Sequence, residues 1–229
     1  MLVICAMALS VWRLTNDKIT GVIQLIGVAV KSTAAPILAA MFAETGSTLL
    51  IDCDPPQFTS ECWYIERERR GREGDLKLIR AEDEHSLGSI LRNAQADYIV
   101  LDAAPRITKT SKQILAVSDL VLVPVSTAGA DVWATFDTEE AIQEELAERK
   151  SLKVRLLMNR YRDYVNSAKA IKREVKKDFE VPVMNSTLGY REAYAQALGT
   201  GLCADEVGNP KATEEITKLT NEVIRLLRR

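Results

Sequence analysis

Residues 26–42 read IGVAVKSTAAPILAAMF, in which a Lys-Ser-Thr triplet stands between a short apolar run and a longer helical pattern. We expect the apolar run GVIQLIG, residues 21–27, to form a strand and residues 33–44 to form a helix. A Lys-Ser-Thr triplet that opens a helix after a strand is typical of a loop that binds phosphate groups. Only Gly27 precedes the lysine in this stretch, so the glycines that such a loop usually contains are mostly missing.

The alternation of short apolar runs and longer helical patterns continues along the chain, as is typical of βαβ units around a parallel sheet. Further strands are expected at 47–52, 76–81, 97–102, 119–125, 153–159 and 181–187. Further helices are expected at 86–95, 109–117, 131–149, 166–178, 190–199 and 211–228. Several strands are apolar on both faces, so helices should cover both sides of the sheet. No linker interrupts the pattern, and we predict a single α/β domain over residues 1–229.

The composition is ordinary for one large soluble domain, with 47% hydrophobic and 27% charged residues among 229. The formal net charge is −2, so an overall basic character cannot drive nucleic-acid binding. The four cysteines show no CxxC spacing and His85 is the single histidine, which favours reduced thiols in a cytosolic protein. The apolar N-terminal stretch MLVICAMALSVW is shorter than the roughly 20 residues that span a bilayer. We therefore expect no membrane insertion.

Acidic residues follow two of the expected strands. LLIDCDP ends one strand with Asp52 and Asp54, and YIVLDAAP ends another with Asp102. Ligands of open parallel sheets bind at the carboxyl ends of the strands, where these aspartates lie. A single aspartate at such a place is usually a cap or turn residue. Together with the upstream Lys31 and Ser32, however, the aspartates indicate a site for a nucleoside triphosphate with Mg²⁺.

The motifs, taken in their order along the chain, resemble the ParA/MinD family of deviant P-loop ATPases, and in particular the small plasmid-partition ParA proteins. The resemblance extends from about Lys31 to Arg225, whereas residues 1–20 are atypical. It implies a mostly parallel, twisted sheet of the P-loop NTPase type with helices on both faces. The segments that carry it are KST, LLIDCDPPQFTSECW, DYIVLDAAP, SDLVLVPV, ADVWAT, KVRLLMNR, VPVMNSTLGYREAYAQAL and ATEEITKLTNEVIRLL.

The resemblance implies that the chain binds ATP and Mg²⁺ through identifiable residues. Lys31 would hold the β- and γ-phosphates during catalysis, and Asp54 would position the attacking water. Ser32 would ligate Mg²⁺, Asp102 would orient the shell around the metal, and Asp52 would support the metal's waters.

Four further nucleotide contacts are implied by the same resemblance. Gly27 and Thr33 would lie beside the phosphates, on either side of the lysine and serine. Asn159 and the segment beginning at Pro182 would face the adenine.

For the whole protein, the resemblance implies an ATPase that segregates a plasmid or chromosome or positions another cargo. ATP binding would produce a homodimer that binds DNA without sequence preference, and a ParB-like or other adaptor would stimulate hydrolysis. Such a protein would be cytoplasmic and associated with the nucleoid, without contact to a membrane.

The chain departs from the family in its phosphate-binding loop, where the family motif is KGGxGK[ST]. Ile26 replaces the first lysine, and Val28 and Val30 replace two glycines. Glycines let the backbone approach the phosphates and adopt φ values that β-branched residues avoid, so we predict weak or absent ATP binding. Three explanations stay open: an aberrant but working loop, a relative that has lost ATP binding, and an altered reading frame over residues 1–30.

Two prolines bear on the same region. A proline is harmless in the first turn of a helix but costs about 3 kcal/mol in its interior. We therefore predict that the helix containing Pro36 begins late, near Thr33. DPPQ stands where the family has DPQ, and the additional proline should shift the loop beside Asp54.

Basic residues recur every seven positions along the last expected helix, which places them on nearly one face. By resemblance, this stripe would bind DNA; the alternative is a solvated face with favourable cations at a helix C-terminus. The stripe consists of Lys211, Lys218 and Arg225, followed by Arg228. A second basic cluster is interpreted as a plain solvated helix face: Lys169, Lys172, Arg173, Lys176 and Lys177. A DNA-binding adaptor that dimerises without ATP is the main alternative to the ATPase.

Overall fold

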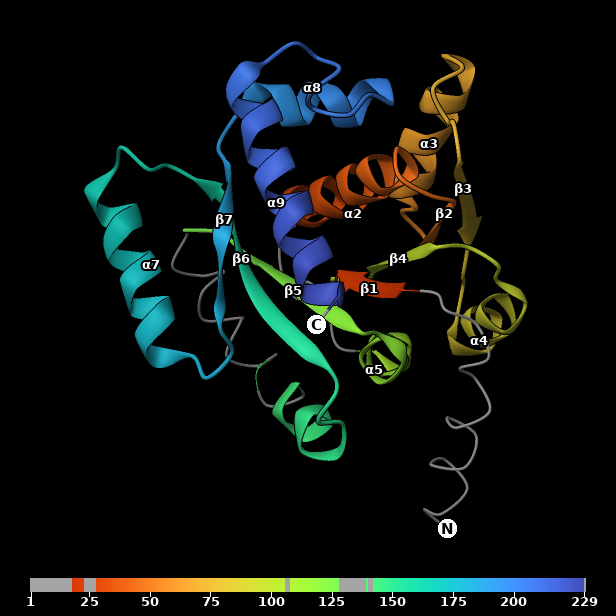
Figure 1. The fold of residues 1–229 in the computed structure, drawn as a ribbon, viewed down its shortest axis with the longest axis horizontal. Coiled ribbons are helices and arrows are strands. Elements are labelled where there is room, and N and C mark those ends of the chain that lie inside the picture. The colour runs from red at the N-terminus through yellow and green to blue at the C-terminus, as the bar shows by residue number, and fades with distance from the viewer. Residues whose placement is uncertain (1–17, 23–27, 106–107, 128–138, 140–141, 229) are drawn as a thin grey trace.

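The computed structural model describes residues 18–22, 28–105, 108–127, 139 and 142–228, and for residues 22 and 28–33 it describes the backbone only. Within this part of the chain, seven strands form one sheet in the order β3-β2-β4-β1-β5-β6-β7 (Figure 1). Every described pair of neighbouring strands is parallel. The predicted α/β fold with a parallel sheet is therefore confirmed. The strands are β1 (Lys18–Val22), β2 (Thr48–Cys53), β3 (Leu76–Arg80), β4 (Tyr98–Ala103), β5 (Leu120–Val125), β6 (Lys153–Tyr161) and β7 (Val183–Gly189).

The central strands are buried on both faces because successive side chains point to opposite sides of a strand. In β4, Val100 belongs to one hydrophobic core, while Ile99 and Leu101 belong to the other. The same division separates Leu50 from Ile51 in β2. Continuous apolar strands of this kind are stable only where helices cover both sides of a parallel sheet.

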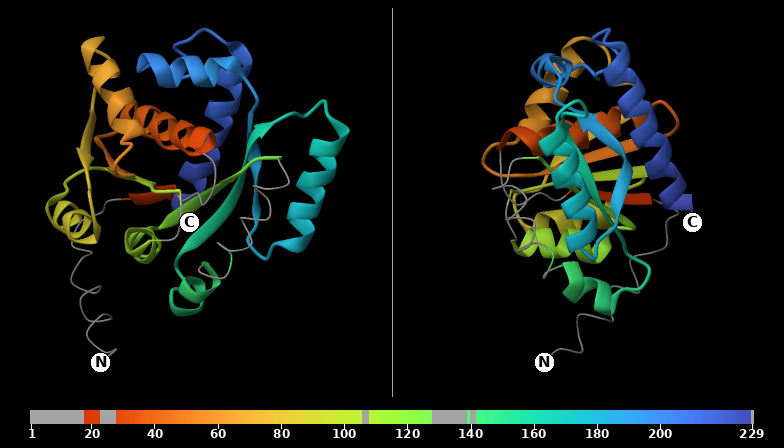
Figure 2. Two further views of the ribbon diagram at one scale, coloured as in Figure 1. Left: turned by 180° about the vertical axis from the view of Figure 1, so that it is seen from behind. Right: turned by 90° about the vertical axis from the view of Figure 1, so that its left-hand side faces the viewer.

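Two sets of helices provide this cover, and they lie on opposite sides of the sheet (Figure 2). The first set packs in the core that contains Leu50 and Val100. It comprises α2 (Val28–Ala43), α3 (Thr59–Arg69), α8 (Glu192–Thr200) and α9 (Pro210–Arg228). The second set comprises α4 (Glu84–Asn93), α5 (Lys109–Val117), the helical residues 142–148 and α7 (Asn166–Asp178).

Three predicted element boundaries need correction. The first strand is Lys18–Val22, earlier than the predicted 21–27, and residues 23–27 lie outside the described part of the chain. Helix α2 begins at Val28, five residues before the predicted start at 33. Of the predicted helix 131–149, the described helical part is 142–148 together with residue 139, since 128–138 and 140–141 are not described.

The prediction that the helix containing Pro36 begins near Thr33 is wrong, because α2 begins at Val28 and Pro36 therefore lies beyond its first turn. A proline at this position has no N–H to donate to the carbonyl four residues earlier, which costs about 3 kcal/mol. The helix is nevertheless continuous, and its residues 34–40 are all buried. Burial of large side chains such as Leu38 and Phe42, worth about 1.5–3 kcal/mol each, outweighs the local cost.

Of helix α3, the sequence predicted only an exposed helix end within ERERRGREGD, residues 66–75, because TSECWYIERER has few apolar residues and little amphipathic pattern. Long-range contacts hold it in place. The indole N–H of Trp63 donates to the Leu202 carbonyl at 2.9 Å, and Arg67 donates to Glu206 at 2.7 Å. Close packing requires a glycine at position 201, at the end of α8. Gly201 has φ 70°, and a Cβ atom there would lie 2.2 Å from the backbone nitrogen of Arg67. The position of α3 is thus set by tertiary contacts.

Candidate functional site

The strand-end aspartates that the sequence singled out lie together at the carboxyl edge of the sheet. Asp52 of β2 and Asp102 of β4 are direct partners in the register of these two strands. Their exposed fractions are 0% and 1%, and Asp54, two residues beyond Asp52, is 4% exposed. Carboxylates are rarely this deeply buried without a structural or chemical reason.

Asp52 organises the turn that follows β2. Its Oδ1 accepts a hydrogen bond from the Asp54 backbone N–H, and its Oδ2 accepts one from the Glu61 N–H, both at 3.1 Å. The Asp54 carbonyl in turn accepts bonds from the N–H groups of Gln57 and Phe58, each at 3.0 Å. Both prolines of DPPQ lie in this turn, which ends at Phe58 in the left-handed region with φ 42°, and the predicted shift of the loop stays a prediction.

Asp102 has a partner that sequence reasoning missed. The hydroxyl of Ser60, in the first turn of α3, donates to Oδ2 of Asp102 at 2.6 Å. Ser60 is fully buried. The sequence signal was weak, because serine is common at helix starts and 42 residues separate the two side chains.

The Lys-Ser-Thr triplet follows β1, the strand that ends beside Asp102. Val22, the last residue of β1, is in register with Asp102 of β4, so the chain leaves β1 beside that aspartate. It re-enters the described region at Val28, and the backbone of Lys31, Ser32 and Thr33 lies in the opening turns of α2. The side chains of these three residues, and all of Gly27, lie outside the described part, so their predicted contacts stay predictions.

Val28 and Val30 are part of α2 and have helical backbone conformation. The steric objection to valine in a glycine conformation therefore does not apply to the arrangement seen here. The consequence is of another kind: the backbone N–H groups just before Lys31 begin a helix instead of forming a concave loop. A helix N-terminus still attracts anions, although a loop of consecutive N–H groups surrounds a phosphate more completely.

Asn159 and Pro182 do not lie together. Asn159 is 2% exposed near the carboxyl end of β6, where its side-chain oxygen accepts a bond from the Arg160 N–H at 2.8 Å. Pro182 precedes β7, and its carbonyl accepts from the N–H of Leu156, which lies three residues before Asn159 on β6. The part of this segment that reaches the edge near Asn159 is the carboxyl end of β7, where Gly189 is in register with Tyr161.

A cavity of about 860 Å³ opens next to Asn159. Its walls are α3, the end of β6, the residues after β7, and α8. Trp63 and Cys62 line it from α3, and Tyr190 lines it from the connection after β7. The side chains of Arg160 and Arg162 lie over the Tyr190 ring, with guanidinium carbons 4.9 and 4.3 Å from its centre. This size matches a small-molecule or cofactor site.

The carboxylates fit a metal that is shared with phosphate groups. In the described residues, no group of three or more His, Cys, Asp or Glu side chains is arranged to hold a metal ion by itself. Mg²⁺ typically keeps several waters and uses one or two carboxylates together with substrate phosphates. Asp52 and Asp102, adjacent and buried at the carboxyl edge of the sheet, meet that requirement.

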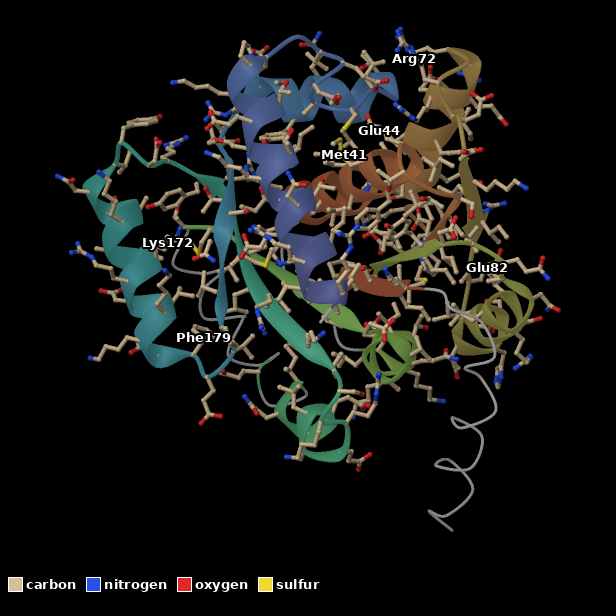
Figure 3. All side chains as sticks on the ribbon, in the orientation of Figure 1. Met41, Glu44, Arg72, Glu82, Lys172 and Phe179 are labelled. Atoms are coloured by element: carbon tan, nitrogen blue, oxygen red, sulfur yellow. The ribbon has the colours of Figure 1, made fainter. Side chains whose placement is uncertain are left out.

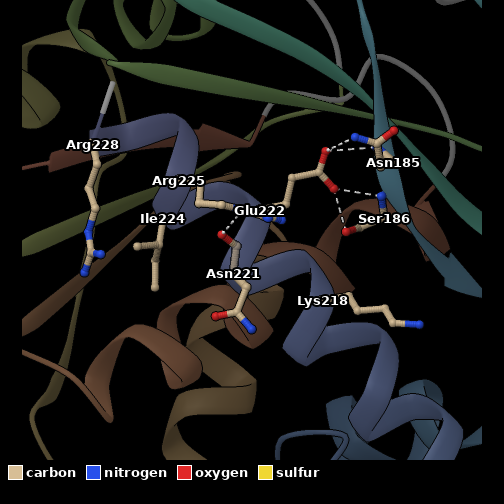
Figure 4. A pocket seen from close by; sticks show the side chains of 8 residues that line it. All are labelled: Asn185, Ser186, Lys218, Asn221, Glu222, Ile224, Arg225 and Arg228. Atoms are coloured by element: carbon tan, nitrogen blue, oxygen red, sulfur yellow. Dashed lines mark hydrogen bonds between the residues drawn. The ribbon is translucent and has the colours of Figure 1, made fainter.

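The basic stripe of α9 is exposed at all four predicted positions, Lys211, Lys218, Arg225 and Arg228. Figure 4 shows three of them around a hollow that also includes Asn185, Ser186 and Glu222. Lys218 is paired with Glu214 one turn earlier, which partly neutralises it. The stripe is therefore available to a ligand, although its positive charge is not isolated.

The second basic cluster, on α7, differs in one residue from a plain solvated face. Lys172, which Figure 3 labels on α7, is half-buried. Its ammonium group lies 5.1 Å from the centre of the Tyr161 ring. Desolvation and the nearby Lys176 lower the pKa of Lys172 below its usual value. Lys169, Arg173 and Lys176 are exposed, as predicted.

Among the described residues, no helix has the length and apolar character needed to cross a bilayer.

Known proteins share both sequence and fold with this chain. No protein-family model matches it. The chain is 24% identical to the maintenance of carboxysome distribution protein A of Halothiobacillus neapolitanus over 207 residues, 89% of this chain and 94% of that protein. A variant of McdA from Cyanothece, solved in complex with ATP, has a TM-score of 0.74 at 16% identity, over 91% of this chain and 97% of that one. A plasmid partition protein from Borrelia burgdorferi has a TM-score of 0.68 at 19% identity, over 92% and 99%.

Proposed function

We propose that this chain, a member of the ParA/MinD family of P-loop ATPases, binds ATP with Mg²⁺ and uses the nucleotide to position a cargo in the cell. The similarity to a carboxysome distribution protein and to a plasmid partition protein supports a positioning role. The ATP complex of the Cyanothece McdA variant supports the choice of nucleotide.

One observation carries the proposal: Asp52 and Asp102 are buried side by side at the edge of the sheet where β1 leads into α2. Burying two neighbouring carboxylates is costly unless hydrogen bonds or a cation compensate them. Hydrogen bonds to Asp52 and Asp102 compensate part of this cost, and a Mg²⁺–triphosphate site uses carboxylates placed in this way.

The chain's own residues divide the work as follows. Ser32, Asp52 and Asp102 would hold Mg²⁺ and its waters, and the metal would neutralise charge on the phosphates. Lys31, with the N-terminal end of α2, would hold the phosphates themselves. Asp54, whose backbone is tied to Asp52, would orient the attacking water. The cavity beside Asn159 would receive the nucleoside.

The test is calorimetric titration of the chain with ATP in the presence and absence of Mg²⁺. Binding that requires Mg²⁺, and that is lost in Lys31→Ala and in Asp102→Asn, is the expected result. Lys77→Ala is the matched control, because Lys77 is an exposed lysine of β3. Binding that Lys31→Ala leaves unchanged would contradict the proposed site.

The proposal extends to assembly. ATP binding would produce a homodimer in the cytoplasm, the dimer would bind nucleoid DNA through the α9 stripe, and a ParB-like or other adaptor would stimulate hydrolysis. Exposure of Lys211, Lys218, Arg225 and Arg228 supports the DNA contact. Light scattering with and without ATP measures the dimer, and one mass at all nucleotide concentrations would contradict it.

A second candidate function is an adaptor that descends from such ATPases and has lost ATP binding. The helical backbone of residues 28–30 favours it, because those N–H groups then belong to a helix start and not to a loop around the phosphates. DNA binding that is independent of ATP, in a chain that does not bind the nucleotide, would support the adaptor.

A further inference from the structure

Ser60 connects the start of α3, which follows the turn after β2, to the end of β4. It lies in the first turn of α3, its exposed fraction is 0%, and its hydroxyl donates to Oδ2 of Asp102 at 2.6 Å. A hydroxyl bonded to an ionised oxygen is roughly twice as strong a contact as one between neutral groups. The contact is therefore a substantial restraint on the Asp102 carboxylate.

The next residue makes a second, parallel connection. The Glu61 N–H donates to Oδ2 of Asp52 at 3.1 Å, so two consecutive residues of α3 bind the two aspartates that are neighbours in the sheet. The start of α3 cannot move away from the sheet without breaking both bonds. The orientation of the carboxylates and the position of α3 are thus mechanically linked.

We propose that Ser60 is a positioning residue for Mg²⁺: it fixes the rotation of the Asp102 carboxylate and links metal binding to the position of α3. The proposal rests on the proposed function. The terminal torsion of aspartate has broad, shallow preferences, so hydrogen bonds to its oxygens decide the orientation of the carboxylate. With Oδ2 held by Ser60, the carboxylate is presented to the metal in one orientation.

The linkage continues through α3 to the first core. Trp63, one turn after Ser60, donates its indole N–H to Leu202, and Arg67 donates to the Gly201 carbonyl at 3.2 Å. Both acceptors lie in the connection that leads to α9. A shift of α3 would reach that connection, and Trp63 reports on it because indole emission depends on its surroundings.

The first experiment measures the contact in the nucleotide-free protein. Unfolding by urea is compared for Ser60→Ala, Asp102→Asn and the double variant, with Thr59→Ala as the neighbouring control. We expect Ser60→Ala to raise the unfolding equilibrium constant about tenfold when Asp102 is present and about threefold or less with Asp102→Asn. Equal effects in both backgrounds would overturn the proposal.

The second experiment measures how strongly Mg²⁺ binds in the presence of ATP. In a chain with Ile26→Lys, Val28→Gly and Val30→Gly, the substitutions Trp12→Phe and Trp133→Phe leave Trp63 as the one indole. Mg²⁺ is titrated at fixed ATP while the emission of Trp63 is followed. Ser60→Ala should raise the half-saturating Mg²⁺ concentration about tenfold and reduce the emission change. Ser89→Ala, at an exposed serine of α4 away from this cavity, should leave both as in the parent.

The two readouts separate the possible failures. Coupling between Ser60 and Asp102 without a change in Mg²⁺ dependence would make Ser60 a purely structural contact and overturn the proposal. If the parent of the titration series binds no Mg²⁺–ATP, the proposed function fails and this inference fails with it. Coupling preserved in the first experiment would then show that the contact at Ser60 exists and that the fault lies in the nucleotide site.

Discussion

Helices α2 and α9 pack together on the same face of the sheet, and each contains a proline, but the prolines stand in different places. Pro210 is the first residue of α9, where a missing N–H has no intrahelical partner to lose. Pro36 lies inside α2, where the carbonyl four residues earlier loses its N–H donor. Helix α9 therefore begins where its proline favours a helix start, whereas α2 continues through a proline that disfavours a helix.

The difference shows what stabilises each helix. In α9, the buried residues Ala212, Ile216, Leu219 and Val223 are three or four positions apart, and the Asn209 side chain accepts from the Ala212 N–H at the helix start. The hydrophobic spacing, the N-terminal cap and the packing of α9 all favour the same helix, so its bounds are well determined by the sequence. In α2, a run of buried small and apolar side chains supplies the stability, and the N-terminal turn is the weakly encoded part.

The largest expected effect concerns that N-terminal turn. Ile26→Lys, Val28→Gly and Val30→Gly together should strengthen Mg²⁺-dependent ATP binding about a hundredfold, because two restored backbone bonds to phosphate contribute about 1.4 kcal/mol each. Calorimetric titration of both chains measures the change.

Val28→Ala with Val30→Ala is the matched control for this change. Alanine also removes the branched side chains but keeps helical preference, so it should not restore binding. Tight ATP binding by the unmodified chain would show that the helical start of α2 serves the phosphates as well as a glycine loop does.

The proline comparison can be measured directly. Pro36→Ala should raise the free energy of unfolding by about 2 kcal/mol, which is the gain in helix hydrogen bonding less the apolar surface lost from this buried side chain. Pro210→Ala should change it by less than about 0.5 kcal/mol, since the first helical position tolerates proline. Urea unfolding of both variants gives the two values, and equal effects would contradict the contrast.

The stripe of α9 is the next test. Lys218→Glu with Arg225→Glu should weaken binding to unrelated DNA duplexes by about tenfold and reduce the salt dependence by about two phosphate contacts. Lys77→Glu with Lys109→Glu changes the net charge equally on two exposed lysines elsewhere. If both pairs weaken DNA binding alike, the net charge of the protein is responsible and the stripe is not a specific contact.

The smallest expected effect is the attachment of α9 to the edge strand. Glu222 accepts bonds from the Asn185 and Ser186 N–H groups at 2.9 and 2.8 Å. Burial alone would raise the pKa of Glu222, but the bonds from Ser186 and Asn185 lower it below its usual 4.5. This stabilisation is therefore present above pH 4.5 and is lost as the pH falls through the lowered value.

Glu222→Gln should therefore reduce the free energy of unfolding by about 1 kcal/mol at pH 7, and the difference should shrink below pH 4.5. Glu174→Gln, on the exposed side of α7, is the control and should show little change at either pH. A difference that stays constant from pH 7 to pH 3.5 would mean that the charge of Glu222 does not hold β7.

Part of the candidate site could be predicted from the sequence because its residues stand next to recognisable local patterns. Asp52 and Asp102 follow apolar strands, and parallel strands bring their carboxyl ends to one edge, so their proximity was predictable before any coordinates. Ser60 and Asn159 show the limit. Asn159 was found only through a family resemblance, and nothing beside Ser60 in the chain indicates a bond to a residue 42 positions away.

The sequence by itself determined the alternation of strands and helices, the parallel sheet covered on both faces, and the edge at which the acidic side chains meet. These properties follow from hydrophobic periodicity, which acts over a few residues and is therefore visible in the chain. Tertiary structure alone decided that α2 begins at Val28 with Pro36 inside it, that α3 is a helix, and that Ser60 binds Asp102. Each of these depends on burial or on contacts between distant residues, whose free energies exceed the local preferences that a sequence displays.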